Sequence, residues 1–116
     1  MHEMAIADAV VDIAARQARG APVARVELRV GQMRRLVPPA LYLAFELASS
    51  GGPVQGAELE LDLVEAAGVC RACGKKTPLP DISLTCGHCG SPEIEVTRGQ
   101  ELVVEAIELE ASAGLV

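Results

Sequence analysis

Two Cys-x-x-Cys pairs constrain this chain more than any other feature of its sequence. Cys70 and Cys73 form the first pair, Cys86 and Cys89 form the second, and the chain has no other cysteine. Thiolates are the preferred ligands of structural zinc, and two cysteines separated by two residues can reach one ion from a single tight turn. The sequence therefore predicts a tetrahedral Zn(II) site made by these four cysteines. A glycine after the second cysteine of each pair permits the positive φ that such a turn needs.

Disulfides, a redox-active pair and an iron site with four sulfur ligands are the alternatives for these cysteines. The opening of the chain is polar and charged, without an apolar signal region, and its apolar runs are too short to cross a bilayer. We therefore expect a cytoplasmic protein with no membrane segment, in a compartment where thiols stay reduced. Zinc fits that expectation better than disulfides do.

Length and charge limit the remaining choices. A chain of 116 residues supports one core domain, with room for a small insertion. Its formal charge of -6 and its aromatic content of 2% disfavour nucleic acid, because phosphates would be repelled and bases would find no stacking surface. It shows neither a phosphate-binding loop nor a plausible Ser-His-Asp set, so we predict that it is not an enzyme.

Hydrophobic periodicity predicts two helices. Residues 4–19 form an amphipathic pattern, and residues 40–49 form a second one after two prolines that suit a helix start. The expected buried stripe of the first helix is Ile6, Ala9, Val10, Ile13 and Ala14; that of the second is Leu41, Ala44, Phe45 and Ala48.

Three segments alternate as strands do. Residues 23–30 place Val26, Leu28 and Val30 on one face, and residues 57–65 place Leu59, Leu61 and Leu63 opposite acidic residues that could pair with Arg25 and Arg29. Residues 101–110 alternate imperfectly, which indicates a bulge or burial on both faces.

This order predicts an α+β fold with two helices packed on a three-stranded sheet. We expect residues 1–67 and 94–116 to form this α+β domain. Residues 68–93 are expected to form a zinc-binding module inserted between the second and third strands, which relies on the ion because it has few large apolar residues.

The first residues offer a second, chemically different metal site. The amine of Met1, the backbone nitrogen and imidazole of His2, and Glu3 can close adjacent chelate rings on one ion, and nitrogen donors suit Ni(II) or Cu(II). The alternative is that His2 is a solvated residue at a frayed terminus and that Glu3 only favours the helix dipole.

Several segments together resemble the HypA/HybF family of nickel metallochaperones. They are the Met-His-Glu-Met opening, Val26-Glu27-Leu28-Arg29-Val30-Gly31, Leu43-Ala44-Phe45-Glu46, Gly56-Ala57-Glu58-Leu59, the two cysteine pairs and Gly99-Gln100-Glu101-Leu102. Their order and spacing extend over nearly the whole chain.

The resemblance implies delivery of nickel during maturation of [NiFe]-hydrogenase, and in some organisms of urease. It implies a HypB-type GTPase and a hydrogenase large-subunit precursor as partners, and it leaves a homodimer open. Met1, His2 and Glu3 become nickel ligands, and the four cysteines hold a structural zinc. Some members have an acidic nickel contact near the second helix, where this chain has Val37 and Pro38, so a side-chain ligand from that loop is not expected.

His88 lies inside the second cysteine pair. It is either a solvated turn residue or a pH-responsive neighbour of the zinc centre, because protonation would place a cation beside four thiolates. The main alternative for the whole protein is a zinc-ribbon module that binds other proteins without transferring nickel.

Overall fold

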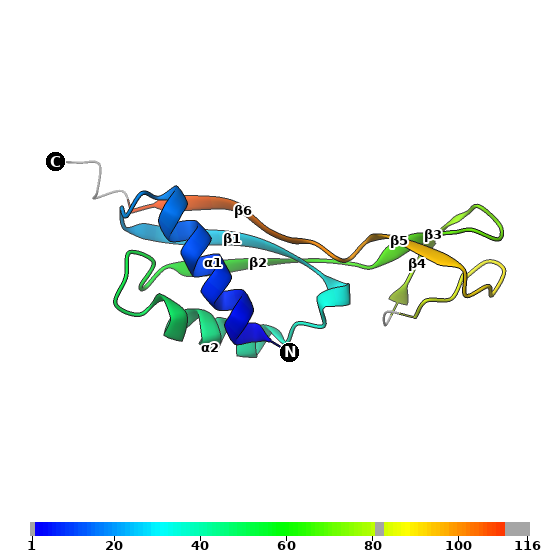
Figure 1. Cartoon of the computed structure of the whole chain (residues 1–116), viewed down its shortest axis with the longest axis horizontal. Coiled ribbons are helices and arrows are strands. Elements are labelled where there is room, and N and C mark those ends of the chain that lie inside the picture. Colours follow the sequence, from blue (N-terminus) through cyan, green and yellow to red (C-terminus); the bar gives the residue numbers. More distant parts are fainter. Residues whose placement is uncertain (1, 81–82, 111–116) are drawn as a thin grey trace. The chain divides into compact units, whose positions relative to one another are not determined.

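The structure is a computed structural model that describes residues 2–80 and 83–110. Its elements in chain order are α1 (Glu3–Gln17), β1 (Val23–Gly31), the 3-10 turn η1 (Gln32–Arg34), α2 (Pro38–Ser49), β2 (Glu58–Val64), β3 (Ala67–Cys70), β4 (Lys76–Pro78), β5 (Ile94–Arg98) and β6 (Leu102–Leu109) (Figure 1). One sheet has the strand order β2-β1-β6 and a second, smaller sheet has the order β4-β3-β5. The predicted α+β class is confirmed. In the described residues no helix is both long and apolar enough to cross a membrane.

The chain forms two compact units. Residues 1–28, 36–62 and 103–116 make the first, which we call the helical unit because it contains α1 and α2. Residues 29–35 and 63–102 make the second, which we call the cysteine unit because it contains all four cysteines.

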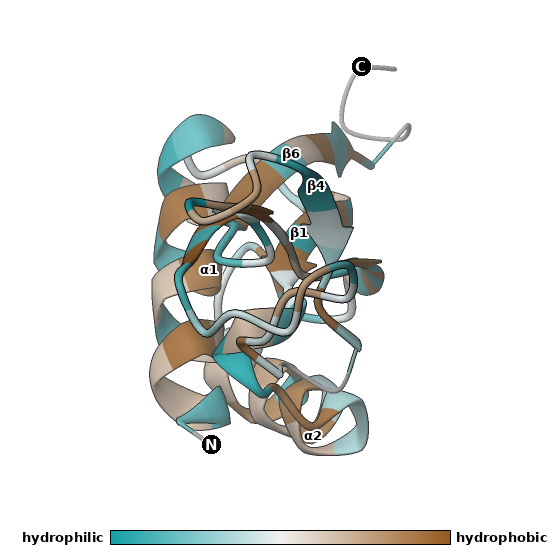
Figure 2. Ribbon diagram, turned by 90° about the vertical axis from the view of Figure 1, so that its right-hand side faces the viewer, coloured by the Kyte–Doolittle hydropathy of each residue, from teal (hydrophilic) through white to brown (hydrophobic). Residues whose placement is uncertain are grey.

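In the helical unit, α1 and α2 pack against each other, and both hydrophilic and hydrophobic segments occur along their ribbons (Figure 2). On α1, Val10 and Ala14 are buried as predicted. Ala9 and Ile13 are exposed, however, and Ala7 is buried instead. The buried stripe of α1 is therefore rotated about the helix axis relative to the predicted one. Several small residues of α1 could line its buried face, and packing against the rest of the unit determines which of them do.

Helix α2 follows the prediction closely. Pro38 occupies the first helical turn after an extended Val37, which suits its fixed φ and missing N–H. Leu41, Ala44 and Phe45 are buried, and Phe45 supplies the only phenylalanine of the chain to this core.

Strand β1 lies between β2 and β6 and buries Val26 and Leu28. The predicted charge pairing across the sheet is confirmed for Arg25, whose guanidinium lies 3.0 Å from carboxylate oxygens of both Glu60 and Glu108. Each exposed ion pair of this kind contributes little to stability. A strand pairing that places opposite charges side by side is nevertheless favoured over one that does not.

The two outer strands of this sheet depart from the sequence pattern. On β2 the alternation slips by one residue, so Leu63 is 51% exposed and Val64 is buried. On β6 the expectation of burial on both faces is wrong, because no residue of this strand is fully buried and both Val103 and Leu109 are largely exposed. An edge strand has a neighbour on one side only, and apolar residues there remain partly accessible.

The cysteine unit contains strands that the sequence analysis did not predict. The central strand β3 pairs antiparallel with both β4 and β5. Gly68 permits the close approach of β5, since a Cβ at this position would lie 2.5 Å from the carbonyl oxygen of Glu95. These strands are three to five residues long, which is too short for a periodic signal to stand out.

Candidate metal centre

Two matching turns position the four cysteines. Cys70 ends β3 and Cys86 begins the second turn, and each accepts at its carbonyl oxygen a hydrogen bond from the glycine four residues later: Gly74 at 2.7 Å and Gly90 at 3.0 Å. Both glycines have a φ of 76°, as the sequence analysis predicted for these positions. The repeated turn is what points both sulfurs of each pair in one direction.

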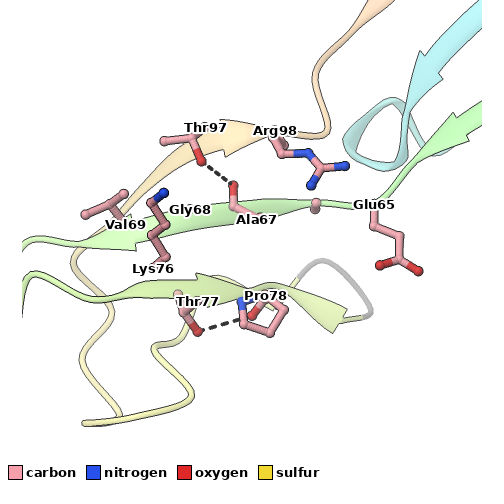
Figure 3. A pocket seen from close by; sticks show the side chains of 10 residues that line it. Glu65, Ala67, Gly68, Val69, Lys76, Thr77, Pro78, Thr97 and Arg98 are labelled. Atoms are coloured by element: carbon pink, nitrogen blue, oxygen red, sulfur yellow. Dashed lines mark hydrogen bonds between the residues drawn. The ribbon is translucent and has the colours of Figure 1, made fainter.

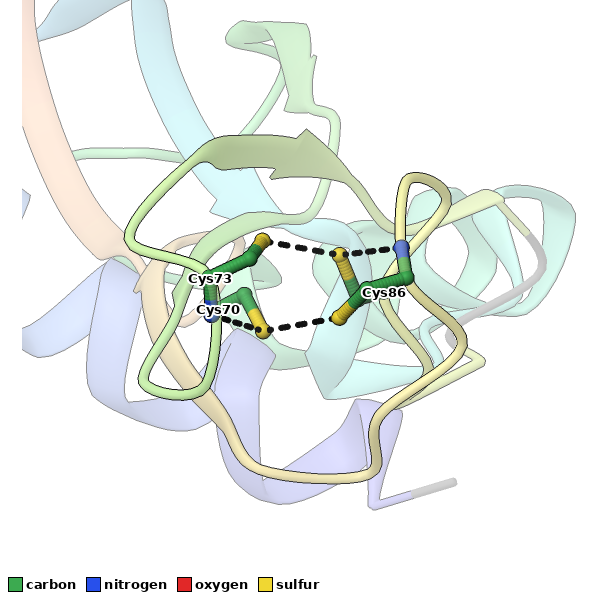
Figure 4. A group of neighbouring side chains, drawn as sticks. Cys70, Cys73 and Cys86 are labelled. Carbon is green, nitrogen blue, oxygen red and sulfur yellow. Dashed lines mark hydrogen bonds between the residues drawn. The ribbon is translucent and has the colours of Figure 1, made fainter.

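The four sulfurs form one compact cluster. Their Sγ atoms all lie within 4.8 Å of one another, with Cys70 and Cys89 at 3.6 Å and Cys73 and Cys86 at 3.7 Å (Figure 4). A tetrahedral zinc with Zn–S bonds of about 2.3 Å requires sulfurs that are roughly 3.8 Å apart. All four cysteines are free, and these distances are far too long for a disulfide bond of about 2.05 Å.

Backbone N–H groups turn toward the cluster and favour thiolates. The N–H groups of Cys89 and His88 lie 3.4 and 3.3 Å from the sulfur of Cys86, and in that order they lower its pKa to about 6. The N–H of Cys73 is the main cause that lowers the pKa of Cys70.

Cys89 behaves in the opposite way. The backbone N–H of Ser91 lowers its pKa, but the neighbouring sulfur of Cys70 and partial burial outweigh this effect and raise the pKa to about 12. Adjacent thiolates repel one another, so the full set of four can be ionised together only around a cation.

The arrangement can hold an ion but leaves it no open position. Four thiolates complete a tetrahedron, so neither water nor substrate can reach a fourth site as in catalytic zinc centres. Cys70 and Cys86 are buried while Cys73 and Cys89 are exposed, which places the cluster at the edge of the unit. The donor set fits a structural zinc, and iron remains compatible with the same four sulfurs.

His88 is close to the cluster without joining it. Its backbone N–H lies 3.3 Å from the sulfur of Cys86, and its ring nitrogen Nε2 lies 3.2 Å from the carbonyl oxygen of Lys76. The side chain is exposed. Its suggested role as a pH-responsive neighbour stays a prediction.

The predicted nickel site lies at the start of α1. Met1 lies outside the described residues. His2 is exposed and has a left-handed backbone with φ 65° and ψ 24°, and its side chain makes no capping hydrogen bond to the helix. Glu3 is half-buried, and its Oε2 accepts a hydrogen bond from the backbone N–H of Val37 at 3.0 Å.

Val37, which stands where some family members have an acidic residue, approaches the site in a way that was not predicted. No acidic side chain follows η1, so a ligand from this loop was not expected, and the structure brings a backbone amide there instead. A contact made by a backbone N–H cannot be recognised from the residue types in the sequence. Only the packing of α1 beside α2 shows it.

Comparisons with known proteins bear on the fold and the family of this chain. Residues 1–109 match the family model described as "Hydrogenase/urease nickel incorporation, metallochaperone, hypA". The chain is 38% identical to the hydrogenase maturation factor HypA of Geobacter sp. (strain M21) over 110 residues, covering 95% of this chain and 100% of that protein. The corresponding protein of Rippkaea orientalis is 36% identical over 110 residues, covering 95% of this chain and 96% of that protein.

Solved structures with the same fold include the solution structure of the Ni metallochaperone HypA from Helicobacter pylori. It has a TM-score of 0.66 and 20% sequence identity, and the match covers 94% of this chain and 97% of that one. At that identity the likeness shows the fold alone, while the family model and the curated relatives show the family. The chain belongs to the HypA family of metallochaperones for nickel incorporation into hydrogenase and urease.

Proposed function

We propose that this protein binds Ni(II) at its N-terminus and delivers it to the large-subunit precursor of a [NiFe]-hydrogenase in the cytoplasm, with urease as a second recipient in organisms that have both enzymes. A HypB-type GTPase is the proposed partner, since the chain has no phosphate-binding loop of its own. The membership of the chain in a nickel-incorporation family supports this assignment.

The proposed nickel ligands are the amine of Met1, the backbone nitrogen and imidazole of His2, and Glu3. The observation that carries the proposal is the conformation of His2. A left-handed backbone costs a non-glycine residue about 1 kcal/mol or more, and because Arg19 and Arg35 adopt it too, it supports a site at His2 only together with the metal-ligating side chain there. The imidazole of His2 is not used to cap α1, so it is available to an ion.

Glu3 supports the same site from the side of α2. The hydrogen bond from Val37 holds its carboxylate next to the start of α1. A carboxylate also offsets the positive end of the α1 dipole, which otherwise opposes a bound cation. We therefore expect nickel binding that is reversible and that weakens on acidification, because protons compete for the same nitrogens.

The proposed zinc site has a separate, structural role. The four cysteines Cys70, Cys73, Cys86 and Cys89 hold Zn(II) and close the cysteine unit. Leu79 is the largest fully buried side chain among the described residues of segment 63–102. A unit with so small a core depends on its ion for stability.

The first test is a calorimetric titration of nickel into untagged, zinc-loaded protein. We expect stoichiometric binding by the wild type and its loss in His2→Ala, because the imidazole closes one of the chelate rings. His88→Ala is the matched control, since it removes the only other histidine and should leave nickel binding unchanged. Equal nickel binding by wild type and His2→Ala would instead favour the zinc-ribbon interaction module.

A further inference from the structure

The open face of the small sheet carries a groove that has no role in holding either metal. Its cavity has a volume of about 510 Å³, which is within the usual range for a binding site. The floor is the outer side of β3, made by Ala67, Gly68 and Val69, and β4 and β5 form the two walls (Figure 3).

Two cations border this groove from opposite walls. Lys76 lies on β4 opposite Val69, and Arg98 lies on β5 opposite Ala67. Among the described residues neither side chain has a carboxylate within ion-pair distance, although Arg98 interacts electrostatically with Glu101 at longer range. Glu65 also lines the cavity, so its lining has two cations and one acid.

The spacing of the cations suits an extended chain. Their partners on β3 are two residues apart, and an extended strand rises about 3.3 Å per residue, so the two charges are offset by roughly 7 Å along the groove. Side chains at alternate positions of an extended peptide point to the same side at the same interval. Two acidic side chains separated by one residue can therefore face Lys76 and Arg98 together.

The distribution of charge in the whole protein favours the same ligand. The helical unit has eleven acidic and three basic residues, a formal charge of -8, whereas the cysteine unit has five acidic and seven basic residues, a formal charge of +2. A zinc ion with four thiolates adds -2 and makes the cysteine unit neutral. An acidic segment is thus repelled by the helical unit and tolerated by the cysteine unit.

We infer that the groove over β3 binds an extended acidic segment of a partner protein. Its carboxylates pair with Lys76 on one wall and Arg98 on the other, and the side chain between them points away from the floor. The groove contains none of the proposed ligands of nickel or zinc, so this docking site is additional to metal transfer.

The wall formed by β4 depends on the second cysteine pair. The hydroxyl oxygen of Thr77 accepts a hydrogen bond from the backbone N–H of Gly87 at 3.1 Å, and the carbonyl oxygen of Lys76 lies 3.2 Å from Nε2 of His88. The groove should therefore keep its shape only while zinc holds this turn in place, and chelation of zinc should weaken binding of the segment.

The test uses fluorescence anisotropy with a labelled eight-residue peptide of alternating glutamate and leucine, added to untagged zinc-loaded protein. We expect saturable binding by the wild type. The double variant Lys76→Glu/Arg98→Glu should weaken it by about tenfold or more, the effect of losing two exposed ion pairs. Unchanged zinc content and circular dichroism would show that the variant is folded.

The matched control is Lys75→Glu/Arg71→Glu, which changes the net charge equally with two cations of the same unit that do not line the groove. It should alter binding by less than about twofold, since exposed charges at a distance are screened by salt. Equal weakening by the two double variants, or no saturable binding of the peptide up to about 1 mM, would overturn the inference. Displacement by inorganic phosphate as effective as by unlabelled peptide would also overturn it, because a general anion site would then explain the binding.

Discussion

In the turn before β6, the path of the backbone depends on the absence of a Cβ at Gly99 and on the carboxylate of Glu101. Gly99 has a φ of 108°, and a Cβ at this position would lie 2.7 Å from the Cα of Ala66. Its N–H donates a hydrogen bond of 2.7 Å to Oε1 of Glu101. The pKa of Glu101 is lowered first by its own backbone N–H and then by that of Gly99 and by the positive charge of Arg98, against a partial opposing effect of burial.

Replacing Glu101 with Gln should therefore destabilise the protein in a pH-dependent way. A carboxyl whose folded pKa is depressed stabilises the fold above its unfolded pKa, and this stabilisation is lost as the pH falls through the folded value. We expect Glu101→Gln to reduce the free energy of unfolding at pH 7, with a difference from wild type that shrinks as the pH falls below 4.5, the ordinary value for Glu. Denaturant unfolding at several pH values measures it.

The control for this prediction is Glu110→Gln, which replaces an exposed carboxyl and should leave the free energy of unfolding at pH 7 close to that of the wild type. Zinc loss at low pH affects wild type and variants alike, so the difference between them is the quantity to compare. A difference for Glu101→Gln that stays constant from pH 7 to below 4.5 would contradict the assigned role of the charge.

At the scale of elements, the three-residue strand β4 and Leu79 after it make stabilising contacts outside the strand ladder. Thr77 is 1% exposed, and its hydroxyl oxygen accepts a hydrogen bond from Gly87 inside the second cysteine turn. Leu79 follows the strand, is fully buried, and donates its N–H to the carbonyl oxygen of Ala66. A strand this short has few ladder bonds, so its side-chain contacts decide where the turn lies.

We predict that Thr77→Val speeds the release of zinc. Valine keeps the shape but leaves the N–H of Gly87 without its partner, at a cost of about 1–2 kcal/mol, which corresponds to roughly a tenfold effect. The rate of zinc transfer to a coloured chelator in excess measures it. Thr97→Val is the control, because the hydroxyl of Thr97 is exposed and bonds to Ala67 away from the cysteine turns. Equal rates for the two variants would show that this hydrogen bond does not support the site.

At the scale of the whole molecule, the two units differ in how they are stabilised. The helical unit buries large side chains, among them Leu28, Leu41 and Phe45, and needs no ion to do so. Within the described residues of segment 63–102 fewer side chains are fully buried than in the helical unit. The largest of them are Leu79, Thr77 and Cys70. We therefore expect stability in the first unit to come from apolar burial and in the second to depend largely on the proposed zinc ion.

Removal of zinc should therefore affect the units unequally. We expect a strong chelator to abolish the dispersed amide resonances of residues 67–98 while the far-ultraviolet circular dichroism of α1 and α2 remains. Returning zinc should restore the resonances. Loss of the helical signal together with the zinc would contradict the prediction and would show that the two units unfold as one.

Periodic segments were predictable because their signal is local. Helices α1 and α2 and strands β1, β2 and β6 were each predicted to within about two residues, since seven or more residues of alternating or helical pattern exceed chance. The choice of Ala7 over Ala9 and Ile13 on α1 was not predictable, because several rotations of that helix bury comparable small side chains.

The sequence alone determined that the four cysteines come together and to which family the chain belongs. Two ligands separated by two residues reach one ion through a local turn, so no distant contact is needed to recognise them. Only the tertiary structure decided the approach of Val37 to Glu3, the small sheet and the groove between Lys76 and Arg98. Apart from the pairing of β3 with β4, these features join residues that are more than twenty positions apart, through backbone contacts and short strands whose pairing no local pattern encodes.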